Sequence, residues 1–244
     1  MLPLQLSVYL LLKDKELAGF LEDLKLPEGV VCSWYHPKVL NLPTDEYVVL
    51  ITDQKEHVLT ACAKKPKQRT IVYVGDAEDV ISAVERVDSI WPSNESARIR
   101  KARFKKLIGV LRRQYDAWFY ENALMTAIDS IPELVWYKDV KGEHLRVNEA
   151  FCKTVHKTKE QVQGRGHYYI WDITPEEYNA GEFVCMESEE EVMEAGETRI
   201  FEEPVLTQDG MRHFTTYKSP LFDEFGRIIG TVGVAHDVTD KYEE

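Results

Sequence analysis

The sequence lacks the features that mark disulfide-rich, metal-binding or membrane-spanning proteins. Its four cysteines, Cys32, Cys62, Cys152 and Cys185, lie far apart and without Cys-x-x-Cys spacing. They are expected to be small buried side chains in a reducing compartment, with no metal site. The apolar N-terminal run stops at Lys13 without a basic leader or a cleavage site, so neither a signal peptide nor a membrane span is expected. These absences predict a cytoplasmic protein.

The sequence also lacks the short motifs of the common enzyme classes. It contains no Gly-x-Ser-x-Gly, no His-Glu-x-x-His, no P-loop and no Gly-x-Gly-x-x-Gly. Acidic pairs such as Glu176-Glu177 and Glu202-Glu203 carry little weight in a chain with 42 Asp and Glu residues. No catalytic residue, and hence no enzymatic activity, is expected in these 244 residues.

Positive charge is in deficit over the whole chain. There are 30 Lys and Arg against 42 Asp and Glu, a formal net charge of −12 at pH 7. Because an acidic surface repels phosphate groups, nucleic acid is not expected as a partner, and neither is a membrane. Eight Lys and Arg residues between Arg98 and Arg113 form one basic run. Such a run could bind nucleic acid or an anionic membrane, but it is interpreted as the solvated face of a helix.

Residues 1–94 alternate strand-like and helix-like segments. Their apolar runs have the length and composition of buried strands, and the segments between them show helical spacing. The expected strands are 4–12, 30–35, 47–52, 70–74 and 89–91, and the expected helices are 15–26, 56–64 and 77–87. This alternation predicts a flavodoxin-like α/β fold, with a parallel sheet and helices on both faces.

The order of these segments resembles a response-regulator receiver domain. Asp53 follows the third strand, where a receiver carries its phosphoacceptor, and Asp14 follows the first, where receivers hold magnesium. The sequence departs from the family at Lys13, Gly75 and Trp91, which replace a second acid, a hydroxyl residue and the phosphate-binding lysine. The resemblance therefore implies a degenerate receiver-like domain used for docking, with phosphorylation of Asp53 as the alternative.

Residues 95–128 are expected to form one long helix, because no proline interrupts them. Apolar residues recur there at alternating steps of four and three, and Asn122 holds a polar position that can fix the register of a parallel dimer. This heptad row consists of Phe104, Ile108, Leu111, Tyr115, Trp118, Asn122 and Met125. It predicts a coiled-coil helix and a homodimer, while an amphipathic helix buried in a monomer is the alternative.

Residues 129–242 show a third pattern. The hairpin signature Trp136-Tyr137-Lys138-Asp139-Val140-Lys141-Gly142 leads through a short strand to the helix start Asn148-Glu149-Ala150-Phe151. A helix at 187–196 runs into a Glu-x-Gly-Glu motif, strands are expected at 198–206, 211–221 and 227–236, and Asp237-Val238-Thr239-Asp240 follows.

In this order the segments resemble a PAS domain, of the kind attached to diguanylate cyclases (GGDEF domains) or histidine kinases. The resemblance implies a five-stranded antiparallel sheet with short helices and a pocket between them. It also implies the signal-input region of a bacterial signal-transduction protein. The output domain would lie in the same polypeptide and would be of the diguanylate cyclase type. Asp237 and Thr239 would tie the last strand to the helix that carries the signal out. A stand-alone interaction module without a ligand is the alternative.

The expected pocket residues are mainly aromatic, as is common in ligand pockets. They are Trp136, Phe151, His167, Tyr169, Trp171, Phe183, Met186, Phe201, Phe214 and Tyr217. Haem would need an axial ligand, for which His167 is the candidate. A flavin photosensor would need a cysteine motif that Gly164-Arg165-Gly166-His167 does not match. Neither cofactor is expected, whereas a small-molecule ligand of unknown identity stays open.

Overall fold

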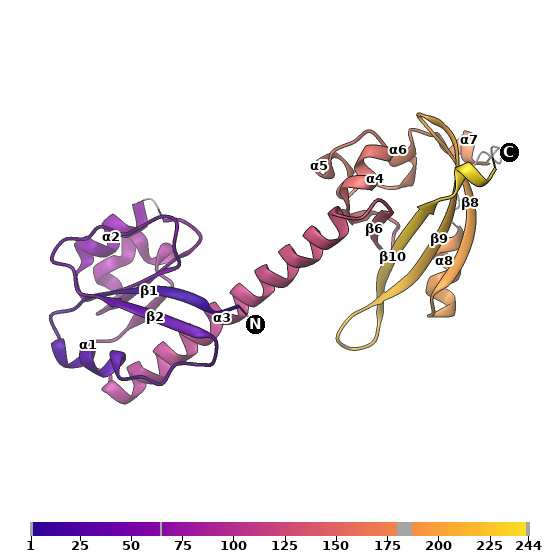
Figure 1. Ribbon diagram of the computed structural model, residues 1–244. Coiled ribbons are helices and arrows are strands. Elements are labelled where there is room, and N and C mark those ends of the chain that lie inside the picture. Colours follow the sequence, from indigo (N-terminus) through magenta and orange to yellow (C-terminus); the bar gives the residue numbers. More distant parts are fainter. Residues whose placement is uncertain (1, 64, 180–186, 243–244) are drawn as a thin grey trace. The chain divides into compact units, whose positions relative to one another are not determined.

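Figure 1 shows the fold of the chain in a computed structural model, which describes residues 2–63, 65–179 and 187–242. Two compact units are present, Met1–Phe119 and Tyr120–Glu244, and each contains a five-stranded sheet. The boundary between the units falls within one long helix, so the three-part division at residues 94 and 128 stays a prediction. Among the described residues, none of the helices is both long and apolar enough to cross a membrane.

The N-terminal unit is built on a parallel sheet with the strand order β2-β1-β3-β4-β5. Its strands are β1 (Leu4–Leu11), β2 (Val30–Tyr35), β3 (Val48–Thr52), β4 (Arg69–Val74) and β5 (Ser89–Trp91). The side chains of β3 and β4 are buried at every position, as expected of central strands covered on both faces. The predicted parallel α/β architecture is confirmed.

Helices cover both faces of this parallel sheet (Figure 1). The helical segments are α1 (Lys15–Glu22), α2 (Lys55–Ala63), the 3-10 segment η1 (Ala77–Arg86) and α3 (Ala97–Asp129). One core cluster joins α1 and α3 to the sheet, and another joins α2 and η1 to it. The predicted α-helix at 77–87 is instead a 3-10 segment with a kink at Val80.

The first four residues of the predicted heptad row lie in the long helix α3 but do not face a second helix. Phe104 and Ile108 are fully buried in the core of the N-terminal unit, and Leu111 and Tyr115 pack against the same core. These side chains therefore cannot form a dimer contact. The apolar spacing predicted a dimer contact here because a helix that packs one face on a sheet repeats its apolar residues much as a coiled coil does.

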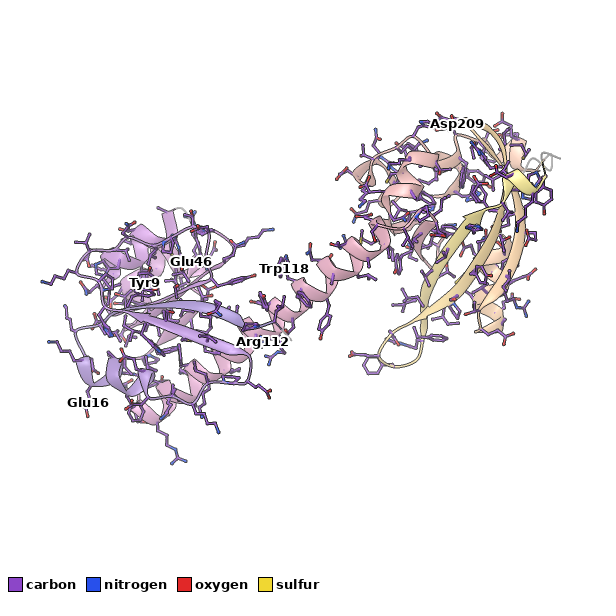
Figure 2. All side chains as sticks on the ribbon, in the orientation of Figure 1. Tyr9, Glu16, Glu46, Arg112, Trp118 and Asp209 are labelled. Atoms are coloured by element: carbon purple, nitrogen blue, oxygen red, sulfur yellow. The ribbon has the colours of Figure 1, made fainter. Side chains whose placement is uncertain are left out.

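Arg112 fastens α3 to the edge of the N-terminal sheet (Figure 2). Its buried guanidinium donates to the backbone oxygens of Leu2, at 2.9 Å, and Gly29, at 2.7 Å. It also forms two hydrogen bonds with the Asp116 carboxylate, at 3.0 and 2.7 Å. This planar donor group holds the start of β1, the turn before β2 and the helix together.

The C-terminal unit is built on an antiparallel sheet with the strand order β7-β6-β10-β9-β8. Its strands are β6 (Leu134–Asp139), β7 (His144–Val147), β8 (Arg199–Thr207), β9 (Gly210–Phe222) and β10 (Ile228–Asp237). Its helical segments are α4 (Glu149–Thr154), α5 (Lys159–Val162), α6 (His167–Trp171), α7 (Pro175–Asn179), α8 (Glu187–Ala195) and η2 (Thr239–Lys241). The predicted five-stranded antiparallel sheet with short helices is confirmed.

Replacing Arg112 by methionine tests its role as a fastener of α3. Arg112→Met keeps much of the apolar stem but leaves Asp116 unpaired and removes the donor from two backbone oxygens. We expect a loss of about 2 kcal/mol in the unfolding free energy of the N-terminal unit. Urea unfolding measures it. The exposed neighbour Arg113, changed to methionine, is the matched control and should shift stability by less than about 0.5 kcal/mol. Equal effects of the two variants would contradict the assignment.

Candidate functional site

A cavity of about 40 Å³ lies in the C-terminal unit between the sheet and the helices α4 and α6. All five strands of the sheet contribute to its described lining. The apolar side chains in that lining are Leu134, Trp136, Phe151, Trp171, Val205, Phe214 and Ala235. The polar ones are Lys138, His144, His167, Glu203, Thr216 and Lys218. Apolar walls with a few polar groups are typical of small-molecule sites.

The structure brings half of the predicted pocket residues together at this cavity. Those that line it are Trp136, Phe151, His167, Trp171 and Phe214. Phe201 is half-buried beside the Lys218 ammonium and does not contribute to the described lining. Phe183 and Met186 lie outside the described residues.

Two of the predicted pocket residues face away from the cavity. Tyr217 is 47% exposed because it lies between Thr216 and Lys218 on β9, and successive strand side chains point to opposite faces. Tyr169 is 42% exposed on α6, where the cationic groups of Lys157 and Arg165 lie over its ring. The same alternation along β9 could have identified Thr216 and Lys218, which share a face with Phe214.

A buried glutamate of α8 connects that helix to two strands of the sheet. Glu189 accepts hydrogen bonds from Lys138 Nζ at 2.9 Å, from Trp136 Nε1 at 3.3 Å and from Thr231 Oγ1. The Trp136 ring can lie flat on the sheet because Gly233, opposite it on β10, has no side chain. The sequence does not reveal this arrangement, since α8 and β6 are about 50 residues apart and no local pattern pairs them.

A second buried pair completes the charge balance of the site. Lys218 Nζ lies 2.8 Å from Glu203 Oε1, and the hydroxyl of Ser188 bonds to both groups. Lys218 Nζ is also 3.8 Å from Glu189 Oε1. The described part of the site thus contains two lysines and two glutamates, all less than a tenth exposed.

The electrostatics of this network keep the glutamate charged. Burial raises the pKa of Glu189, but the ammonium groups of Lys138 and Lys218 outweigh it and lower that pKa to about 2. Burial lowers the pKa of Lys138, while its pairing with Glu189 opposes that shift. Separately, each buried charge would be costly, and together they compensate one another.

The two histidines of the cavity are uncharged at neutral pH. Burial and the nearby charge of Lys138 lower the pKa of His144 to about 4 and that of His167 to about 2. His144 Nδ1 lies 2.9 Å from the backbone oxygen of Arg165. A carbonyl oxygen can only accept, so Nδ1 carries the proton and Nε2 is left as an acceptor.

The junction between the long helix and the PAS-like sheet is made by Asn148. Its fully buried side chain accepts from the backbone N–H groups of Phe151 and Val135, each at 3.0 Å. Its amide nitrogen donates to the backbone oxygens of Ile128 and Glu133, each at 2.8 Å. The predicted helix cap of α4 is therefore also the residue that joins the end of α3 to β6.

The predicted exit residues fasten the other end of the sheet. Asp237 Oδ1 accepts from the backbone N–H of Thr239 at 2.9 Å and from its hydroxyl at 2.5 Å. Thr239 Oγ1 in turn accepts from the backbone N–H of His213 on β9 at 3.0 Å. This geometry ties η2 to β9, and the role of these residues in signal exit stays a prediction.

The receiver-like residues of the N-terminal unit do not assemble an open acidic site. Asp53 accepts from the backbone N–H of Lys13 at 2.7 Å, and the Asp14 carboxylate caps α1 through the N–H of Leu17. Trp91 is fully buried in the core. Across the described ranges no cluster of three or more His, Cys, Asp or Glu residues could hold a metal ion.

A comparison with known protein families identifies the C-terminal unit. Residues 128–243 match the model of a family described as a PAS fold. These residues form a PAS domain. No curated protein matches the chain.

Several solved structures are similar to this chain over about half of its length. A complex of Vibrio cholerae VqmA with ligand and DNA is 21% identical, with 48% of this chain and 51% of that chain covered and a TM-score of 0.41. The PAS domain of Bordetella pertussis BvgS is 22% identical, covering 51% and 90%, with a TM-score of 0.36. A PAS domain from Colwellia psychrerythraea is 19% identical, covering 50% and 98%, with a TM-score of 0.40. The match thus spans about half the length of the VqmA chain.

The prediction that nucleic acid is not a partner is wrong. Structures similar to this chain include VqmA bound to DNA. The prediction rested on the net charge of the whole chain, which is a sum over two units of different charge. Residues 1–119 hold 18 Lys and Arg against 16 Asp and Glu, whereas residues 120–244 hold 12 against 26. The acidity of the chain therefore belongs to the PAS unit and says nothing against a basic N-terminal surface.

The lowered histidine pKa predicts acid sensitivity of the PAS domain. The unfolded state takes up protons below pH about 6.5, but buried His144 takes one up only near pH 4. Stability is therefore complete above pH 6.5 and falls as the pH drops towards 4, by up to about 1.4 kcal/mol per pH unit for each such histidine.

Unfolding of the wild type and of His144→Gln between pH 7 and pH 4.5 measures this effect. The variant should lose less stability over that interval, whereas the exposed-site control His36→Gln should behave as the wild type. The same slope in His144→Gln would contradict the assignment.

Proposed function

We propose that this chain is the sensory input region of a bacterial signal-transduction protein, acting in the cytoplasm and without an enzymatic activity of its own. The observation that carries the proposal is the cavity of the PAS domain. A buried polar atom also supports it: Thr216 Oγ1, in the lining, has no hydrogen-bond partner among the residues that the structure describes. A ligand that bonds to this hydroxyl would remove the cost of leaving it unsatisfied.

The proposed ligand is small and uncharged. A cavity of about 40 Å³ has room for only about three or four water-sized groups, at roughly 10–15 Å³ for each, unless its walls move. Haem and flavin would need several hundred Å³. Lys138 and Lys218 line the cavity and are paired with Glu203, which also lines it, and with Glu189, which lies next to it. Because these four charges already balance, a charged ligand would add an uncompensated buried charge. A short polar molecule that contacts Thr216 or the free acceptor of His144 fits best.

The proposed signal passes through α3. A ligand that moves Trp136 or Lys138, which line the cavity and bond to Glu189, would shift α8 against β6. Strand β6 begins beside Asn148, which holds the last turn of α3. The change in the cavity would therefore reach the helix through a chain of direct contacts.

Dimerisation is proposed for the last part of α3 only. Trp118, labelled in Figure 2, is 52% exposed there. Trp118, Asn122 and Met125 share one face at heptad spacing, as in a two-helix contact. A second copy of the chain would cover this face, with Asn122 fixing the register.

The proposed output is a diguanylate cyclase domain in the same polypeptide. The support is the resemblance of Asp237-Val238-Thr239-Asp240 to the end of PAS domains that precede such domains. The N-terminal unit would serve as a docking platform. Phosphorylation of Asp53 is not proposed, because the neighbouring acid and hydroxyl that assist it in receivers are replaced by Lys13 and Gly75.

Filling the cavity tests the ligand. Ala235→Val adds two methyl groups to a lining residue and should abolish retention of a small molecule, seen by native mass spectrometry of freshly purified protein. The matched control is Ala123→Val on the exposed face of α3. In thermal-shift assays, short uncharged molecules should raise the melting temperature of the wild type and not of Ala235→Val. Stabilisation by carboxylates alone, or equal responses of both proteins, would contradict the proposal.

Asn148 offers a test of the transmission route. Asn148→Asp keeps the oxygen that caps α4 but replaces the amide donors by a carboxylate facing two carbonyl oxygens. We expect faster hydrogen exchange at the end of α3, around residues 125–130, with protection of α4 retained. Asn148→Ala should lose protection in both segments. Unchanged exchange at the end of α3 in Asn148→Asp would show that this contact does not couple the helix to the sheet.

A further inference from the structure

The basic run in the first half of α3 has a composition unlike the rest of the chain. Residues 97–113 contain eight Lys and Arg and no Asp or Glu, although acids outnumber bases over the whole sequence. A surface helix usually mixes charges, since opposite charges three or four residues apart stabilise it and like charges destabilise it. Neither the proposed ligand pocket nor the proposed dimer contact uses the side chains of this segment.

Half of these eight cations have structural partners. Arg103 pairs with Glu95, and the Lys101 ammonium lies 4.6 Å from the centre of the Phe20 ring. Arg100 is buried and donates to the backbone oxygens of Pro92 and Ser93. Arg112 is the buried fastener of α3 already described. These four residues are accounted for by the fold of the N-terminal unit.

The other four cations are Arg98, Lys105, Lys106 and Arg113. All four are exposed, and none forms an ion pair with any residue that the structure describes. At about 100° per residue they fall within an arc of about 100° that contains neither Phe104 nor Ile108. They extend over about 22 Å along the helix, at about 1.5 Å per residue. We call these four residues the basic stripe.

The residues in the middle of the basic stripe have small side chains or none. Ala102 and Gly109 lie on the same arc, and a side chain added at Gly109 would meet only the guanidinium of Arg113, at 3.6 Å. A rigid surface could therefore approach the helix backbone between the cations. Beside the stripe, Lys106 and the exposed Lys67 line a groove of about 640 Å³ that widens the positive surface.

We propose that the basic stripe binds the phosphate backbone of double-stranded nucleic acid. A duplex is a straight polyanion, and about 22 Å corresponds to about six base pairs along its axis. Single strands are held mainly by stacking of bases on aromatic rings, and this arc of the helix carries none over residues 97–113. A membrane-binding helix would carry several large apolar side chains on its exposed face, whereas the stripe has alanine and glycine between its cations and Ile99 is the one exposed large apolar residue described in 97–113.

Binding through phosphates makes the contact independent of sequence and dependent on salt. Each neutralised phosphate releases counterions, so four contacts give a slope of about −3 to −4 in a plot of log affinity against log salt. The stripe would supply affinity for nucleic acid and not base recognition. This inference stands apart from the ligand pocket, because all its residues lie in the N-terminal unit.

The test uses the full chain and a fluorescein-labelled 20-base-pair DNA duplex, with binding followed by fluorescence anisotropy. Affinity should fall about a hundredfold between 50 and 200 mM NaCl. Lys105→Gln/Lys106→Gln should bind at least tenfold more weakly at 50 mM NaCl, with the slope reduced by about two. The matched control Lys153→Gln/Lys241→Gln removes two exposed lysines from the PAS domain and should bind as the wild type. Circular dichroism and melting temperature should be the same for all three proteins.

Three results would overturn the proposal. The first is no binding of the duplex at 50 mM NaCl. The second is equal weakening by Lys105→Gln/Lys106→Gln and by the control, which would show a diffuse charge effect. The third is stronger binding to a single strand of the same length, or to vesicles containing phosphatidylserine, than to the duplex. None of these measurements involves the cavity. A result that overturns nucleic-acid binding would therefore not contradict the proposed sensory function.

Discussion

The buried amide of Asn148 is the interaction on which the arrangement of the PAS domain depends. An amide can accept and donate at once, and here all of that capacity is used within one chain. Its oxygen accepts from the N–H of Phe151 in α4 and from the N–H of Val135 in β6, while its nitrogen donates to the end of α3 and to the loop before β6. A side chain that only accepts or only donates could not replace it. One residue thus joins the last turn of α3, the start of β6 and the start of α4.

The cavity depends on a different kind of constraint, which is the pairing of buried charges. Lys138 and Lys218 project from neighbouring parts of the sheet towards the centre of the domain, where an isolated ammonium would be unstable. Glu189 and Glu203 pair with these ammonium groups and so offset the cost of burying them. Glu189 also holds α8 against β6 and β10. The network therefore closes the site and sets its electrostatic character, which is polar but balanced in its described part.

Charge is also distributed unevenly between the two units, and this has consequences for partners. The PAS unit carries the whole excess of acidic residues, whereas the N-terminal unit has slightly more Lys and Arg than Asp and Glu. A net charge for the whole chain hides this division. Surface potentials act over about a Debye length, about 8–10 Å in physiological salt, so the local arrangement of charges decides which molecules a face attracts.

The sequence alone was sufficient for the features that depend on near neighbours. The buried strands, the hairpin before Asn148, the cap of α4 and the uninterrupted length of α3 follow from local periodicity and hydrogen bonding. The tertiary structure alone decided which side of each element is covered. It buried Phe104 and Ile108 against a sheet instead of a second helix, turned Tyr217 outwards, and brought Glu189 to Lys138 across about 50 residues of chain. Local rules fix the repeat of a helix or strand, but the surface that it meets is set by packing between segments far apart in the sequence.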